Sequence, residues 1–272
     1  MPRTSPASVC VVSVADLDRN LAFYRDVLGL DASPELLLAG DAFTGQWRLP
    51  AGSTARSALL AHPASAVGRI LLVQFDRPGE NVRGPSLTRQ FLGLWNLNFY
   101  TTDIERASRE LACHGCPSWT PPTTYAISGE TGAPTEVIVD GPEGVIFNLV
   151  QPQGPPETLV GQIRAFLDVP LDGVTRIVFM KGDHLFGKVA LAQPVSYTLP
   201  NFAPRMVAPA VGFLAMGFEV DDVEATVARV GGVGAPLYSA VAELELPGLG
   251  RRRTALVRTP GSGALSWLLA RG

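Results

Sequence analysis

The sequence predicts an α+β fold built from repeated modules, each made of a strand, a helix and further strands. Two observations predict it. A unit of apolar strand, aspartate, amphipathic helix and glycine occurs three times, and glycine-containing turns followed by apolar strands close the modules. The 272 residues, 46% of them hydrophobic, are enough for one large or two medium domains. A single module cannot bury the apolar face of its own sheet, so we expect the modules to pair.

The first unit lies near the start of the chain. Residues 9–14, VCVVSV, form a strand rich in β-branched side chains. Asp16 can cap the next helix because its carboxylate accepts backbone N–H groups that have no partner within the helix. Leu17, Leu21 and Tyr24 follow at helical spacing, and Gly29 ends the helix.

The same unit recurs further along the chain. Residues 96–115, NLNFYTTDIERASRELACHG, place Asp103 as the cap and Gly115 as the stop. Residues 215–232, AMGFEVDDVEATVARVGG, use Asp222 and Gly231 in the same way. A fourth, weaker copy begins at residues 176–191, where Asp183 follows a strand but the helix pattern is poor. Residues 68–75, 140–152 and 259–271 predict the strands that end modules.

A stretch rich in proline and glycine, residues 151–173, separates the second module from the third. We therefore expect an N-terminal domain at residues 1–152 that holds modules one and two. A linker with a short helix follows at residues 153–172. The C-terminal domain covers residues 173–272 and contains the degenerate third module and the fourth module.

Composition excludes several classes of protein. A net charge of −3 argues against nucleic-acid binding, and no apolar run approaches the ~20 residues that cross a membrane. Three cysteines do not form a secreted disulfide framework, so we expect a cytoplasmic protein. For its oligomeric state, a monomer and a homodimer both stay open. Cys113 and Cys116 have C-x-x-C spacing, but they close a helix and lack the second pair that a zinc site needs.

Two motifs carry a family resemblance. ADLDRNLAFYRDVLGL at residues 15–30 and DGPEGVIFNLV at residues 140–150 resemble the vicinal oxygen chelate superfamily of glyoxalases, bleomycin-resistance proteins and extradiol dioxygenases. The resemblance implies four βαβββ modules paired into two glyoxalase-like, cup-shaped domains around small ligands. It also implies a divalent metal, held by a histidine seven residues before each capping aspartate and by a carboxylate four residues after the turn glycine.

This chain has neither ligand type at those positions. The first-strand positions are Val9, Asn96, Arg176 and Ala215, and the last-strand positions are Leu71, Asn148 and Trp267. Apolar side chains cannot donate an electron pair, and an asparagine amide is a weak ligand unless carboxylates accompany it. We therefore expect the scaffold without a metal, and no cofactor.

A polar wall takes the place of the metal ligands. Strand alternation puts Asn96, Asn98 and Tyr100 on one face, and we expect Asn148 beside them. Apolar and small residues are expected across the same cup, namely Val9, Val11, Ser13 and Leu71. Such a wall can stabilise a carbonyl oxygen as it becomes an enolate; the alternative is a hydrogen-bond network that satisfies itself.

The roles within this wall follow from chemistry. Asn96, Asn98 and Asn148 would orient the substrate oxygen, and Tyr100 would donate or relay the proton. Glu136 or Asp140 is an alternative base if its strand faces inward, and either acid can equally be a solvated edge residue.

The second cup has fewer polar groups. Arg176 and Glu219 either form a buried salt bridge that replaces the metal, or bind a carboxylate and act as a base. Trp267 occupies a former ligand position beside them.

We therefore predict a metal-independent lyase, isomerase or cyclase that acts on a hydrophobic, aromatic or polyketide-like carbonyl compound. One alternative is a non-catalytic protein that binds small molecules, like the drug-sequestering members of the superfamily. Another is a metal-dependent lyase or dioxygenase with substituted ligands.

Overall fold

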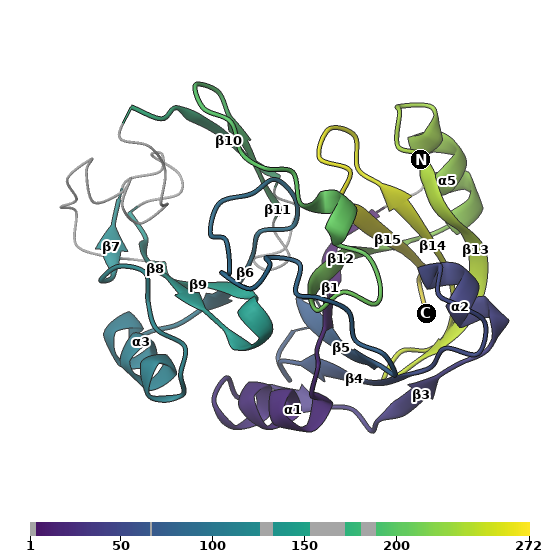
Figure 1. The fold of residues 1–272 in the computed structure, drawn as a ribbon, viewed down its shortest axis with the longest axis horizontal. Coiled ribbons are helices and arrows are strands. Elements are labelled where there is room, and N and C mark those ends of the chain that lie inside the picture. Colours follow the sequence, from purple (N-terminus) through teal and green to yellow (C-terminus); the bar gives the residue numbers. More distant parts are fainter. Residues whose placement is uncertain (1–3, 66, 126–132, 153–171, 181–188) are drawn as a thin grey trace.

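The computed structural model describes residues 4–65, 67–125, 133–152, 172–180 and 189–272. The fold is α+β, as predicted, with curled sheets and few helices. Two lobes lie side by side (Figure 1). One lobe combines modules one and four. The other holds module two and a hairpin from module three.

A nine-stranded sheet builds the first lobe in the order β13-β14-β15-β12-β1-β5-β4-β2, with β3 paired to β4. Module one supplies β1 Thr4–Ser13, α1 Leu17–Asp26, β2 Asp31–Ala32, β3 Leu36–Leu38, α2 Asp41–Trp47, β4 Ala55–Ala61 and β5 Arg69–Phe75. Module four supplies β12 Gly212–Val220, α5 Val223–Gly231, β13 Leu237–Leu246, β14 Gly250–Arg258 and β15 Leu265–Ala270.

The strand order of this sheet differs from the expected pairing of modules one and two. We call the boundary between β1 and β12 the seam. β1 runs antiparallel to β12, so module one shares its sheet with module four. The first strands of modules two and four both lead into a helix that an aspartate caps. Local sequence therefore does not distinguish which of them pairs with β1.

A glycine allows close approach at the seam. Gly217 lies opposite Val9, and a β-carbon at this position would lie 2.9 Å from the Val9 carbonyl oxygen and would also clash with Val9 Cγ1. We expect Gly217→Ala to lower the free energy of unfolding by about 1–3 kcal/mol, because the crowded atoms include backbone. Urea unfolding measures this. Gly231→Ala is the control, since a β-carbon there would have open space; equal loss in both variants would contradict the close seam.

The second lobe has a four-stranded sheet in the order β6-β9-β8-β7 and a separate hairpin. Its elements are β6 Asn96–Tyr100, α3 Ile104–Cys113, β7 Thr123–Thr124, β8 Thr135–Asp140, β9 Ile146–Gln151, β10 Thr175–Met180 and β11 Val189–Pro194. Short 3-10 turns occur at Pro142–Gly144 and Ala203–Arg205. Asp183 and most of the expected linker lie outside the described residues, and the domain boundaries placed there remain predictions.

The three predicted aspartate caps are confirmed. Asp16, Asp103 and Asp222 accept backbone N–H groups from Arg19, Arg106 and Ala225 at 3.0, 3.0 and 2.8 Å respectively. Each bond satisfies one donor that the first turn of the helix leaves without a backbone partner.

Polar and aromatic contacts join the lobes. Glu143, in the turn between β8 and β9, accepts from the backbone N–H of Ala15 and from Asn20 Nδ2, both at 3.2 Å. The rings of Tyr24 and Phe147 meet edge to face, with centroids 5.9 Å apart. The lobes therefore contact each other through α1 and the start of β9. None of the helices in the described part is long and apolar enough to span a membrane.

Candidate functional site

The cup of the first lobe is filled with apolar side chains. The former ligand positions Val9, Leu71, Ala215 and Trp267 are at most 1% exposed and belong to one core cluster. Helix α2 brings Trp47 onto Trp267, with ring centroids 5.9 Å apart. The prediction that Val9, Val11, Ser13 and Leu71 face Asn96 across a ligand is therefore wrong, because those residues are buried in the other sheet.

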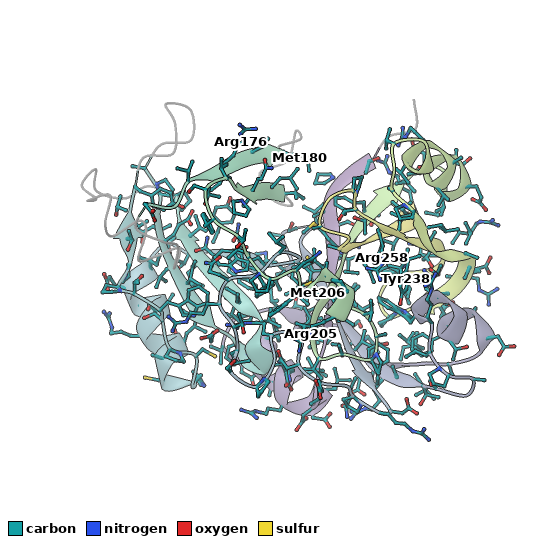
Figure 2. The ribbon with its side chains drawn as sticks, turned by 45° about the horizontal axis from the view of Figure 1, so that its top comes forward. Arg176, Met180, Arg205, Met206, Tyr238 and Arg258 are labelled. Atoms are coloured by element: carbon teal, nitrogen blue, oxygen red, sulfur yellow. The ribbon has the colours of Figure 1, made fainter. Side chains whose placement is uncertain are left out.

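The predicted pair between Arg176 and Glu219 is also wrong. Glu219 on β12 forms its ion pair with Arg69 on β5. The strand order places β1 alone between β12 and β5, which explains this partner. Arg176 is exposed on the separate β10–β11 hairpin, where Figure 2 shows it near the edge of the molecule.

The sheet of module two carries the predicted polar wall. Leu97, Phe99 and Phe147 pack in a core cluster with Ile104 and Leu111 of α3. Since side chains alternate along a strand, the opposite face carries the wall residues. These are Asn96, Asn98 and Tyr100 on β6 and Asn148 on β9, with Asn98 directly paired to Asn148.

Glu136 lies on the same face and is buried. Its side chain is only 8% exposed. Its Oε2 atom accepts hydrogen bonds from the Tyr125 hydroxyl and from Asn148 Nδ2, both at 2.8 Å. Among the described residues no hydrogen bond ends on Oε1. Burial raises the pKa of the Glu136 carboxyl, and the two hydrogen bonds only partly offset the rise.

Asp140, the other candidate base, has a structural role. Its carboxylate accepts from the buried Arg83 guanidinium at 2.6 Å and from Trp119 Nε1 at 3.0 Å. Arg83 also donates to the carbonyl oxygens of Thr88 and Gly144. The ion pair therefore anchors the 83–88 segment to the turn between β8 and β9.

The amides of the wall divide into two groups. Asn96 Nδ2 donates to Asn98 Oδ1 at 2.6 Å, so these two side chains orient each other. Asn148 is 7% exposed, and its Oδ1 atom has no hydrogen-bond partner in the described part of the chain. A buried amide oxygen without a partner is costly, and a ligand that donates a hydrogen bond would satisfy it.

Tyr100 lies on the same face of the sheet as Glu136. It pairs with Val150 on β9, which in turn pairs with Glu136 on β8, so the three residues form one row across the sheet. The Tyr100 side chain is 43% exposed. Burial and the nearby Glu136 carboxylate raise the pKa of its hydroxyl, which keeps it protonated as a donor.

The raised pKa of Glu136 predicts a pH dependence of stability. The unfolded chain loses this proton near the ordinary pKa of 4.5, whereas the folded chain keeps it to higher pH. The stabilising contribution of Glu136 is therefore fully present below about pH 4 and is lost as the pH rises through the folded pKa. Urea unfolding at pH 4–8 should show this decline in the unaltered protein and a flatter profile in Glu136→Gln. Parallel profiles would contradict it.

A comparison with known proteins identifies the family to which this chain belongs. The profile of the Glyoxalase/Bleomycin resistance protein/Dioxygenase superfamily matches residues 7–149, more than half of the chain. The chain belongs to this superfamily. The predicted resemblance is thereby confirmed. A search of curated protein sequences found no match.

Solved structures of the superfamily share the fold over the whole chain. Glyoxalase I from Zea mays is 13% identical, with a TM-score of 0.58, and the match covers 99% of this chain and 93% of that one. A point mutant of the same maize protein gives 14% identity, a TM-score of 0.59 and coverage of 99% and 94%. At this identity the likeness establishes the fold alone.

The residues present do not fit the divalent metal that membership of the superfamily suggests. Val9, Leu71, Ala215 and Trp267 offer no donor atom for a metal, Asn96 and Asn148 are neutral amides, and Arg176 is a cation. The described ranges also contain no cluster of three histidine, cysteine, aspartate or glutamate side chains.

The sequence did not single out Tyr125, and it did not decide between Glu136 and Asp140. Tyr125 lies after β7 in a segment rich in proline and threonine, where no periodic pattern marks a strand face. Glu136 was one of two candidate acids. Its strand is buried on both faces, so alternation of apolar and polar residues does not show which way the acid points.

Proposed function

We propose that this protein is a metal-independent enzyme of the superfamily that moves a proton within a small hydrophobic carbonyl compound. The observation that carries the proposal is the buried Glu136 carboxyl, held at Oε2 by Tyr125 and Asn148. A carboxyl with a raised pKa is a stronger base once ionised, which suits proton abstraction near neutral pH.

A substrate would lie across β8, β9 and β6, over the side chain of Val150. Glu136 Oε1 takes a proton from the carbon next to the carbonyl group, and the electron pair of that C–H bond moves to the carbonyl oxygen. The Tyr100 hydroxyl and Asn98 Nδ2 donate hydrogen bonds to the enolate that forms. Asn96 orients Asn98, and Asn148 orients Glu136. Where a double bond of the substrate is conjugated with the enolate, return of the proton to the far end of that conjugated system completes an isomerisation. Where the next carbon carries a leaving group, its departure with the bonding electron pair completes a lyase reaction.

The first step can be tested without knowing the whole reaction. Aryl ketones and aryl 1,3-diketones are incubated with the protein in deuterium oxide, and deuterium at the carbon next to the carbonyl group is followed by NMR. We expect many equivalents of deuterium to be incorporated per protein into at least one compound. No exchange above the rate in protein-free buffer, across the panel, would contradict the proposal.

The second candidate is a non-catalytic binder of the same compounds. It is favoured by the Asn148 Oδ1 atom, which a bound donor would satisfy without any chemistry. A binder retains about one equivalent of unchanged ligand and incorporates no deuterium, so the same experiment separates the two functions. In both cases the partner is a hydrophobic small molecule.

A further inference from the structure

Two arginines pack against one tyrosine in the first lobe, away from the wall of module two. Tyr238 at the start of β13 is 6% exposed. The guanidinium carbon of Arg48 lies 4.3 Å from the Tyr238 ring centroid, and that of Arg258 lies 5.0 Å from it. Figure 2 shows Arg258 next to Tyr238. The three side chains come from the end of α2, from β13 and from the end of β14.

These two positive charges have no acidic partner within 4.0 Å among the described residues. Arg258 donates one hydrogen bond, to the Gly263 carbonyl oxygen at 2.7 Å, and Arg48 donates none in that part of the chain. Some other arginines of this lobe do have acidic partners. Arg56 and Arg251, for example, each form ion pairs with two carboxylates.

The backbone of Arg48 adds a second observation. Arg48 caps the C-terminus of α2 with a φ of 54°, in the left-handed region that glycine normally occupies at this position. An arginine here is strained, so the side chain must contribute something that glycine cannot. Contact with the Tyr238 ring supplies part of this. Arg48 is exposed, and none of the residues that the structure describes accepts a hydrogen bond from its guanidinium, so its N–H groups are open to a ligand from solvent.

We propose that Arg48 and Arg258, held on the Tyr238 ring, bind a phosphate group, either as inorganic phosphate or as part of a small phosphorylated molecule. Two guanidinium groups match the double negative charge of phosphate, and each presents a planar set of donors that fits its oxygens. Sequence reasoning did not single out this site. It stands independently of the proposed proton transfer, because it lies in the other lobe.

The direct test uses the unaltered full-length protein. The Nε–Hε signals of its arginines are followed by NMR during titration with inorganic phosphate at constant ionic strength, with chloride as the reference anion. We expect the signals of Arg48 and Arg258 to shift saturably while that of Arg251 stays in place. Phenyl phosphate in a parallel titration distinguishes the two sources of the group: tighter binding than inorganic phosphate indicates a phosphorylated small molecule, and equal or weaker binding indicates free phosphate.

Variants test the assignment. Arg48→Gln and Arg258→Gln should each weaken phosphate binding about tenfold or more, because each removes charge-assisted hydrogen bonds. Arg251→Gln, which removes an exposed arginine of β14, should leave binding unchanged. If a variant fails to fold, as judged by near-ultraviolet circular dichroism, the titration of the unaltered protein decides alone. Absence of saturable shifts at Arg48 and Arg258, or equal affinity in all folded variants, would overturn the site.

Discussion

Glu136→Gln should slow deuterium exchange into a responsive carbonyl compound about 10³-fold, within the usual range for loss of a general base. Glutamine keeps the size of the side chain, and its amide oxygen can still accept from Tyr125 and Asn148. The substitution therefore removes proton transfer and preserves shape. We expect the loss in kcat, with KM changed far less.

Two further variants sharpen this result. Glu110→Gln changes an exposed acid on α3, on the other side of the sheet, and should exchange at the normal rate. Tyr125→Phe removes one of the hydrogen bonds that lower the pKa of Glu136. The pH profile of exchange in this variant should shift to higher pH. If Glu136→Gln exchanges at the normal rate, Glu136 is not the base.

Trp267→Ala should lower the free energy of unfolding by about 3–5 kcal/mol, the range for deleting a large aromatic side chain from a core. The indole is fully buried, and its Nε1 atom has no hydrogen-bond partner in the ranges that the structure describes. Its contribution is therefore packing against Trp47 and the surrounding sheet. Equilibrium unfolding in urea measures the change.

Trp95→Ala is the matched control for this loss. Trp95 is partly buried, meets Trp119 edge to face and donates a hydrogen bond to the Arg89 carbonyl oxygen. Its removal should cost less than that of Trp267, because water can reach part of the space that it leaves. If Trp267→Ala is nearly neutral, the first cup is not a packed core and has room for a ligand.

Short-range features of the fold could be predicted from the sequence. The strand, cap and helix of three modules appear where Asp16, Asp103 and Asp222 predict them, because capping depends on residues within one turn. The pairing of modules could not be predicted. The pairing of β1 with β12 is set by contacts about 200 positions apart, and modules two and four both offer a strand before a capped helix.

The candidate site was predicted in part. Alternation along β6 places Asn96, Asn98 and Tyr100 on one face of the sheet. It could not show that Asp140 is held in an ion pair, since its partner Arg83 is distant in the sequence. Arg176 was assigned to a cup wall because it follows the module pattern, yet in the described part the third module contributes only a hairpin.

The antiparallel contact between β1 and β12 joins segments that lie about 200 residues apart in the sequence. During synthesis, β1 leaves the ribosome about 200 residues before β12, so the edge of β1 that pairs with β12 stays unpaired until β12 has been made. Contacts this distant in sequence slow folding and expose unpaired edges to other nascent chains. Truncation before β12 should therefore yield an aggregation-prone fragment instead of a smaller working domain.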